Sequence, residues 1–99
     1  MKKVVKFGGS SLASARQFKK VADIIRTDKS RRYVVPSAPG KRNSKDEKVT
    51  DLLYACYDAA SQGGAYKKIL EKIKNRYMEI IDGLDLLLKQ DRLRATLRT

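Results

Sequence analysis

Residues 3–11, KVVKFGGSS, decide the fold class, because a short strand-like run leads directly into two glycines and two serines. The β-branched stretch Lys3–Phe7 predicts a β-strand, and Gly8-Gly9 predicts the turn that ends it. Glycines let a backbone come close to a ligand, and the amides that open a following helix bind anions. The stretch therefore points to a phosphate-binding turn, with Lys6 within reach of the same phosphate.

The same spacing also fits a plainer structure. The stretch matches neither GxxxxGK[ST] nor GxGxxG, the two glycine patterns that mark nucleotide-binding loops most specifically. A tight strand-to-helix turn beside a solvated Lys6 needs the same residues. Spacing alone leaves both interpretations open.

The segment after this turn predicts a helix and then a second strand. Its apolar residues recur at i, i+3, i+4 and i+7, namely Phe18, Val21, Ala22 and Ile25. That spacing predicts a helix over about residues 13–27, and the apolar run 33–35 before Pro36 predicts a strand. Strand, helix and strand in this order form a βαβ unit, whose strands are parallel and whose crossover is right-handed.

Parallel strands place their carboxyl ends at one edge of the sheet, where open α/β sheets bind ligands. We therefore expect residues 8–11 and 36–40 to lie side by side. The polar stretch 37–48, SAPGKRNSKDEK, predicts a loop at that edge. Ser37 at the mouth of the second strand and Thr50 as a helix N-cap place hydroxyls suited to a small carboxylate or phosphate. A solvent-exposed loop with an ordinary N-cap is the alternative.

The second half of the chain predicts helices. The first carries apolar residues on one side and stops at residues 61–64; they are Leu52, Leu53, Cys56, Ala59 and Ala60. The next carries a stripe of Tyr66, Ile69, Leu70, Ile73, Tyr77 and Ile80. Asp82-Gly83 predicts an interruption before a further helical stretch from Leu84. We expect Tyr54 and Tyr57 to be half-buried, and Cys56 to be a small core residue.

The composition narrows the class of protein. The chain has 99 residues, 41% of them apolar, so it is one small domain or part of a larger one. It has no histidine and one cysteine, which excludes intramolecular disulfides, histidine metal sites and histidine-based triads. No apolar run approaches the roughly 20 residues of a membrane span, and no signal-peptide core follows the N-terminus, so a cytoplasmic location is expected.

The net charge of +12 favours phosphates among the partners. Fourteen of the 23 basic residues precede residue 49, together with four of the 11 acidic ones, so the excess lies where the glycines are. The basic loop residues Lys41, Arg42, Lys45 and Lys48 also suggest a nucleic-acid patch. Asp46 and Glu47 dilute that patch and no aromatic residue is interleaved to stack on bases, so nucleic acid is disfavoured as a partner.

Two blocks together resemble one family. VVKFGGSSLAS, residues 4–14, followed by YVVPSAPGKRNSKDEKVTDLL, residues 33–53, resembles the N-terminal part of aspartate kinases, members of the amino acid kinase superfamily. The resemblance covers roughly residues 2–82. It implies an α/β fold: the βαβ-plus-helices portion of a three-layer amino acid kinase domain of the carbamate kinase-like type. In that domain, residues 1–48 would carry the phosphate and substrate loops and residues 49–99 would be mostly helical.

The resemblance also implies an activity, the ATP-dependent phosphorylation of the L-aspartate side-chain carboxylate to 4-phospho-L-aspartate, with ATP and Mg²⁺ as cofactors. By the same resemblance Lys6 would be catalytic and would stabilise charge on the transferring phosphoryl group. Lys6, Phe7, Gly8, Gly9 and Ser10 would bind the phosphates of ATP, while Ser37 and Thr50 would contact the aspartate substrate. No residue of this chain is expected to ligate a metal.

The chain departs from the family in two ways. Pro36 replaces what is usually an aliphatic residue, which removes one ladder donor and is expected to shorten the second strand. Aspartate kinases are also several times longer, so we expect this chain to be an N-terminal fragment that is inactive alone. Its uncovered apolar stripes suggest self-association or a homo-oligomer. A small basic nucleic-acid- or anion-binding module without catalysis is the alternative function.

Overall fold

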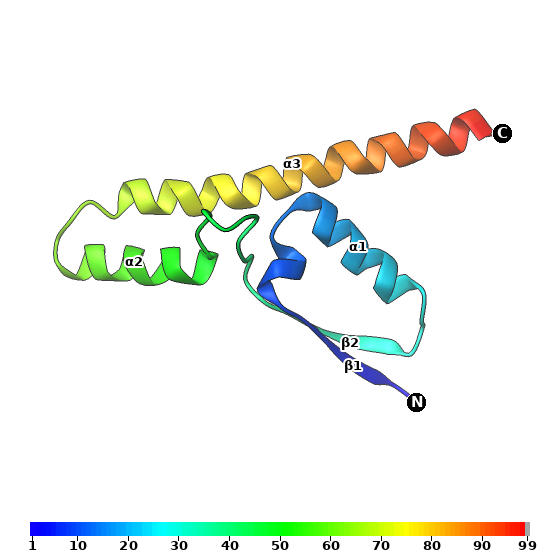
Figure 1. Ribbon diagram of the computed structural model, residues 1–99, viewed down its shortest axis with the longest axis horizontal. Helices are drawn as coiled ribbons and strands as arrows, with labels where there is room; N and C mark the ends of the chain where they lie inside the picture. The colour runs from blue at the N-terminus through cyan, green and yellow to red at the C-terminus, as the bar shows by residue number, and fades with distance from the viewer. Residues whose placement is uncertain (99) are drawn as a thin grey trace.

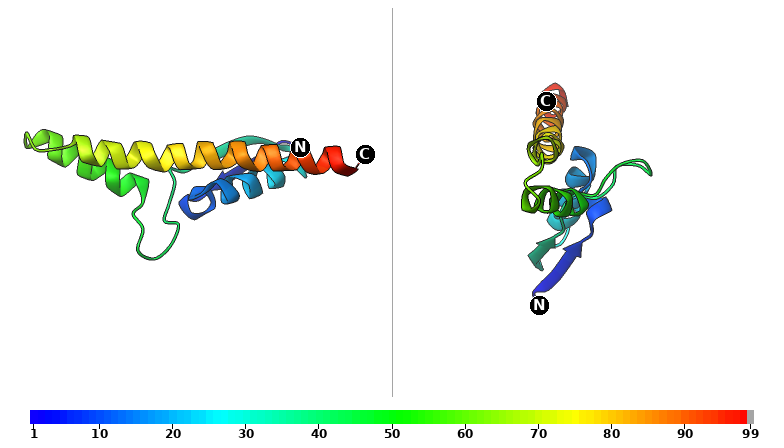
Figure 2. Two further views of the ribbon diagram at one scale, coloured as in Figure 1. Left: turned by 90° about the horizontal axis from the view of Figure 1, so that it is seen from above. Right: turned by 90° about the vertical axis from the view of Figure 1, so that its left-hand side faces the viewer.

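The computed structural model describes residues 1–98, a small parallel sheet with three helices (Figure 1). The elements are β1 (Lys3–Phe7), the 3-10 helix η1 (Gly9–Leu12), α1 (Ala15–Arg26), β2 (Arg31–Pro36), α2 (Val49–Ser61) and α3 (Lys67–Arg98). In Figure 1 the strands lie on one side of α1 and α3 lies on the other, while α2 runs antiparallel to α3. The loop of residues 37–48 protrudes to one side of the helices in Figure 2.

The βαβ unit is confirmed. β1 has the predicted bounds and pairs with β2 in parallel, with Val5 opposite Val34 and Phe7 opposite Pro36. β2 runs from Arg31 to Pro36, longer than the predicted run of residues 33–35. Pro36 does not shorten the strand, because it is the last residue, where a missing N–H interrupts no inner part of the ladder.

Hydrogen bonds flank α1 at both of its ends. The Ser14 hydroxyl accepts a hydrogen bond from the Gln17 amide at 3.4 Å, so the helix begins at Ala15, two residues later than predicted. Beyond its end, the Asp28 carboxylate accepts from the Lys3 ammonium at 2.8 Å and from the Ser30 hydroxyl at 2.6 Å. The Lys3 contact, followed by those of Ser30, holds the pKa of Asp28 well below its usual range.

The best-buried cluster lies between α2 and α3. Val49, Leu52 and Ile73 form it, and the half-buried Cys56 packs against it, as its small apolar surroundings predicted. Thr50 is not the N-cap that the sequence predicted, because Val49 is already helical and Lys48 occupies the cap position without a side-chain hydrogen bond. The physical reason is burial, since starting the helix at Val49 places that side chain, fully buried, in the cluster.

α3 is one continuous helix, so the predicted interruption at Asp82-Gly83 is wrong. Glycine in a helix interior costs about 1 kcal/mol relative to alanine, a penalty that packing can override. Here α3 crosses α1 at Gly83, and a Cβ built on Gly83 would lie 2.6 Å from the Cβ of Ala15. The glycine allows the two helices to approach closely and therefore has a packing role instead of ending the helix.

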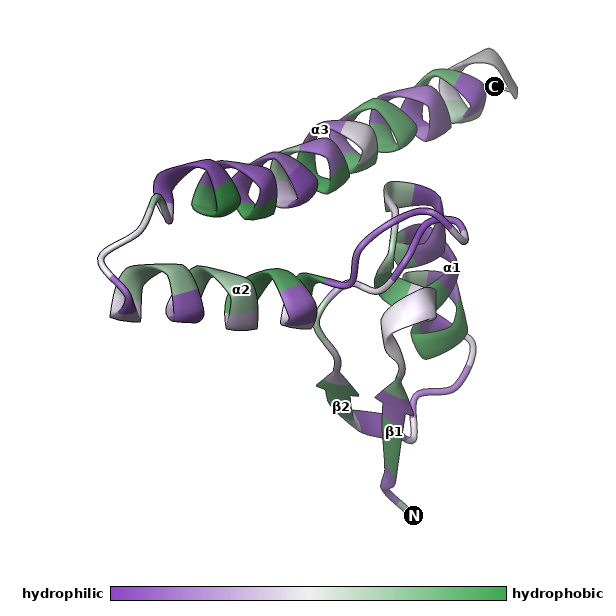
Figure 3. Cartoon of the chain, turned by 60° about the vertical axis from the view of Figure 1, so that its left-hand side comes forward, coloured by the Kyte–Doolittle hydropathy of each residue, from purple (hydrophilic) through white to green (hydrophobic). Residues whose placement is uncertain are grey.

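Much apolar surface remains uncovered, as the excess of apolar stripes over strands predicted. Tyr54 and Tyr57 on α2 are each 72% exposed, so the prediction that they are half-buried is wrong. Apolar residues are also exposed on the sheet, including Val4 and Tyr33, and hydrophobic segments of both strands are visible in Figure 3. No described helix has the length and apolar character of a membrane span.

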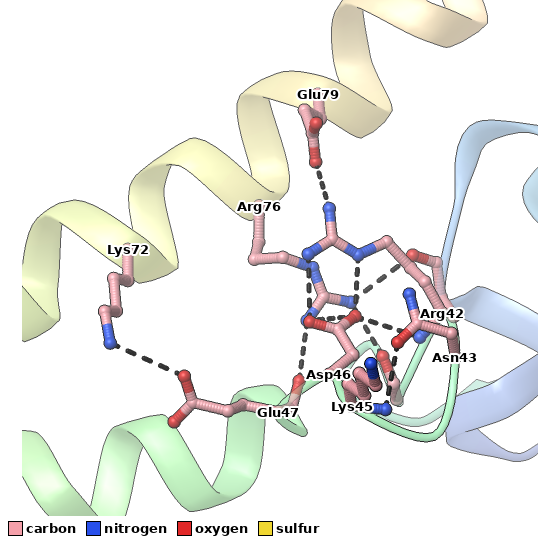
Figure 4. A network of polar contacts seen from close by, with 10 residues as sticks. Arg42, Asn43, Lys45, Asp46, Glu47, Lys72, Arg76 and Glu79 are labelled. Carbon is pink, nitrogen blue, oxygen red and sulfur yellow. Dashed lines mark hydrogen bonds and ion pairs between the residues drawn. The ribbon is translucent and has the colours of Figure 1, made fainter.

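Charged side chains tie the loop of residues 37–48 to α3 (Figure 4). The Arg42 guanidinium donates from Nε to Asp46 Oδ2 at 2.6 Å and from Nη2 to Asp46 Oδ1 at 2.9 Å, and it also pairs with Glu79 of α3. The Arg42 side chain, more than any other contact, holds the pKa of Asp46 well below its usual range. The loop is therefore anchored by ionised groups at neutral pH.

Gly83→Ala should destabilise the chain, although alanine is the better helix former. The added Cβ would meet the Ala15 Cβ, and overpacking of this kind costs about 1–3 kcal/mol, more than the roughly 1 kcal/mol gained in helix propensity. Urea unfolding should therefore show a net loss of about 1 kcal/mol. In an Ala15→Gly background the same change should stabilise, because the clash is gone; destabilisation in both backgrounds would refute the contact.

Acid should weaken the fold through Asp46. Its pKa is depressed in the folded chain, so the unfolded chain takes up a proton first as the pH falls below about 4. The stability that the Arg42–Asp46 contact contributes should be complete at neutral pH and decline from about pH 4 downward. Urea midpoints should therefore fall with acid for the unaltered chain and fall less for Asp46→Asn.

The matched control for this pH dependence is Asp82→Asn, which removes the same charge from an exposed position on α3. It should keep the steep decline of the unaltered chain. Equally flattened profiles for the two variants would assign the effect to net charge instead of to the contact with Arg42.

Candidate functional site

The ends of the two strands meet backbone to backbone, as the βαβ topology predicted. The Gly40 amide donates to the Gly9 carbonyl at 2.8 Å, and the Ser37 amide donates to the Phe7 carbonyl at 3.1 Å. A Cβ built on Gly40 would lie 2.6 Å from the Gly9 carbonyl carbon, so a side chain at this position would need the backbone to move. Glycine at position 40 thus brings the two loops into direct contact.

A pocket of about 390 Å³ opens at this junction. Gly9 and Ser10 line it from the first loop, residues 37–41 line it from the second, and Lys48 and Thr50 line it at the start of α2. The structure therefore brings together four of the residues predicted for phosphate or substrate binding: Gly9, Ser10, Ser37 and Thr50.

The other three predicted residues, Lys6, Phe7 and Gly8, do not line this pocket. Lys6 is exposed near the end of β1, opposite Val35 of β2. Phe7 is half-buried, and Gly8 is exposed and precedes η1. These three residues lie directly before the pocket-lining turn in the chain, so they adjoin the site in sequence without forming its walls.

The local structure gives the pocket its donors. Ser10 lies in η1, and the half-buried Ser37 directly follows β2, where its hydroxyl donates to the Ala38 carbonyl at 3.1 Å. Thr50 is exposed in the first turn of α2, where the helix dipole favours a negative group.

Two lysines were missed as site residues. Lys41 and Lys48 line the pocket, whereas the sequence pattern assigned them to a possible nucleic-acid patch. Lys41 directly follows Gly40 and Lys48 directly precedes α2, so each lysine is next in sequence to a segment that the βαβ topology brings to the pocket. That position in the sequence is the signal that identifies them. The pocket therefore combines two ammonium groups, three hydroxyls and glycine backbone, a set that suits an anion.

The chemistry of this pocket does not suit a divalent cation. No carboxylate lines it, and Mg²⁺ in proteins prefers carboxylate and other oxygen ligands. Within residues 1–98 no group of three or more histidine, cysteine, aspartate or glutamate side chains is placed to hold a metal ion. The residues of this chain thus fit a phosphate or carboxylate ligand and do not by themselves fit Mg²⁺.

The chain is similar to known proteins over most of its length. The sequence profile of the amino acid kinase family matches residues 1–88. Aspartokinase 3 of Bacillus subtilis (strain 168) is 49% identical over 84 residues, which make up 85% of this chain and 18% of that protein. The crystal structure of aspartate kinase from Clostridium acetobutylicum superposes with a TM-score of 0.79 at 51% identity, over 83% of this chain and 19% of that one.

The chain thus spans about a fifth of the length of these two aspartate kinases. The family match takes in both strands, the glycine turn, the pocket and α2, while residues 89–98 of α3 lie beyond it. The observed α/β fold agrees with the solved aspartate kinase at a level of identity where fold and family coincide. This chain therefore belongs to the amino acid kinase family.

Proposed function

We propose that the chain carries the phosphate-binding turn and part of the aspartate site of an aspartate kinase. That enzyme would transfer the γ-phosphoryl group of ATP to the side-chain carboxylate of L-aspartate, giving 4-phospho-L-aspartate and ADP. The observation that carries the proposal is the pocket in which the glycine turn meets Ser37 and Thr50. The similarity to two aspartate kinases at about half identity supports the choice of substrate.

The donors in the pocket suit such a transfer, which depends mainly on positioning and electrostatic stabilisation. Gly9 and Ser10 would hold phosphate oxygens with backbone amides and a hydroxyl, and Lys48 would add positive charge from the other wall. Ser37 and Thr50 would hold the aspartate, with the N-terminus of α2 favouring its carboxylate.

Lys6 is proposed to act from beside the pocket. As an aspartate carboxylate oxygen bonds to the γ-phosphorus, the bond from that phosphorus to the departing ADP oxygen breaks. The ammonium of Lys6 would stabilise the charge that spreads over the phosphoryl oxygens during this exchange. Phe7 and Gly8 would connect Lys6 to the turn and set its distance from the phosphates. ATP normally brings Mg²⁺, for which this pocket offers no carboxylate.

We propose that the two halves of the chain have different roles. Residues 1–48 would supply the phosphate and substrate loops, and residues 49–98 would supply the helices that support them. Because the chain corresponds to about a fifth of the aspartate kinases it matches, catalysis would require residues beyond those present here. Such an enzyme would act in the cytoplasm.

A second candidate function is self-association, which the exposed apolar helix surfaces favour. Leu70, Tyr77 and Ile81 are exposed on α3, as Tyr54 and Tyr57 are on α2. Nucleic-acid binding is less well supported, because Arg42 is engaged by Asp46 and Glu79 instead of presenting a free guanidinium.

Lys48→Met should weaken ATP binding, because it removes one of the two pocket ammonium groups. Loss of a charge-assisted contact is expected to weaken binding by about tenfold. Titration with ATP, followed by NMR shifts of the Gly9 and Ser10 amides, measures the change.

Lys45→Met is the matched control, because Lys45 is exposed in the same loop and does not line the pocket. It should leave ATP binding near the unaltered value. If both variants lose affinity equally, and steeply with salt, the chain binds anions through its net charge and not through this pocket.

Aspartate-dependent ADP release should be absent for the 99-residue chain alone and should appear when the downstream part of a homologous aspartate kinase is added in trans. Lys6→Ala should then lower the restored rate by about 100-fold, the scale seen when one group that stabilises transition-state charge is removed. Lys2→Ala, an exposed lysine before β1, should have little effect. Restored activity that is insensitive to Lys6→Ala would remove Lys6 from the catalytic role.

A further inference from the structure

Arg76 of α3 is the buried charged residue among residues 1–96, whose burial the structure describes, with 5% of its surface exposed. Its guanidinium donates to three backbone carbonyls: from Nη2 to Gly40 at 2.7 Å, from Nη1 to Glu47 at 2.7 Å, and from Nη2 to Ala13 at 3.3 Å. Its Nη1 also lies 3.5 Å from Asp46 Oδ2. Figure 4 shows the guanidinium inserted between α3 and the loop.

The three carbonyls belong to the three segments that build the pocket. Gly40 lies in the second loop, and its own amide donates to the Gly9 carbonyl at 2.8 Å. Ala13 directly follows η1, which carries Ser10, and Glu47 directly precedes Lys48 at the start of α2. Arg76 does not line the pocket itself. It contacts the three segments on the side that faces α3.

The energetics of this contact favour a geometric role over simple stabilisation. Burying a guanidinium costs free energy, and replacing a buried ion pair by apolar side chains is often neutral or stabilising. Here the carboxylate of Asp46 is shared with Arg42, and within the described residues the buried Nε has no hydrogen-bond partner. What arginine provides, and lysine or methionine does not, is a rigid fork that reaches several acceptors at once.

We infer that Arg76 is a positioning residue of the anion pocket, which fixes the glycine turn, the second loop and the start of α2 relative to one another. It acts through Gly40, whose carbonyl accepts from Arg76 while its amide reaches the glycine turn. This inference rests on the proposed function in one respect, which is that this pocket binds the anionic ligand. The positioning itself is a property of the chain without any ligand.

Amide hydrogen exchange of the unliganded chain tests the positioning directly. In the unaltered chain the Gly40 amide donates to the Gly9 carbonyl, and the Val49 amide donates to the Pro39 carbonyl of the second loop at 3.0 Å. In Arg76→Lys, which keeps the charge but loses the fork, these two amides should exchange about tenfold faster, the scale of one lost hydrogen bond to a charged group. Amides of the β1–β2 ladder and of α1 should change little. Arg76→Met serves as the second variant, and Lys74→Met, an exposed site two residues away, is the control for loss of charge.

Exchange that rises equally throughout the chain would show that Arg76 is a general stabilising residue, and unchanged exchange at Gly40 would show that it holds nothing in place. Either result overturns the inference. Faster exchange confined to Gly40 and Val49 in both Arg76 variants, but not in Lys74→Met, supports it.

Titration with ATP separates this inference from the proposed function. If the unaltered chain binds ATP, Arg76→Lys should weaken binding by about tenfold while Lys74→Met should not; equal affinities for Arg76→Lys and the unaltered chain would overturn the positioning role. If the unaltered chain does not bind ATP, the proposed pocket function fails. The exchange data on the unliganded chain then decide the role of Arg76 alone.

Discussion

The contact between Gly9 and Gly40 is the constraint on which the rest of the structure depends. It joins the two loops that end the parallel strands, and it leaves no room for a side chain at position 40. Because the loops meet at their backbones, the side chains next to them, Ser10 and Ser37, face a common space. A small sheet of two strands thus acquires a defined pocket, although its core is modest.

The local βαβ unit was predictable, because strand composition, glycine turn and helical spacing all act over short stretches of sequence. Features that depend on residues far away in the sequence could not be predicted in this way. Gly83 predicted a helix end, yet Ala15 of α1 makes it a point of close approach within a continuous helix. Thr50 had the chemistry of an N-cap, yet burial of Val49 starts the helix earlier. Tyr54 and Tyr57 were expected to be half-buried, but no described segment covers them.

The pocket likewise has residues that local sequence predicts and residues that it does not. Gly9, Ser10, Ser37 and Thr50 were predicted as binding residues from their place in two sequence blocks, and all four line one pocket. Lys48 carried only its position directly before α2 as a signal, and Arg76 carried none, because its role arises from how α3 crosses behind the loop. A periodic pattern shows which face of a helix is apolar, but it does not show that one arginine on α3 bonds to three carbonyls far away in the sequence.

The sheet has two open edges, and the positive charges on its strands have a second effect there. Each strand of this pair has one neighbour within the described chain, so each presents a row of unpaired backbone groups to solvent. Such edges are templates for uncontrolled pairing between molecules, and natural proteins often protect them with charged side chains. Lys3, Lys6, Arg31 and Arg32 lie on these strands, and like charges on two approaching sheets repel. Lys6, which is proposed to act on a phosphate, thus belongs to a set of strand charges that oppose amyloid-like stacking and favour association through the helices instead.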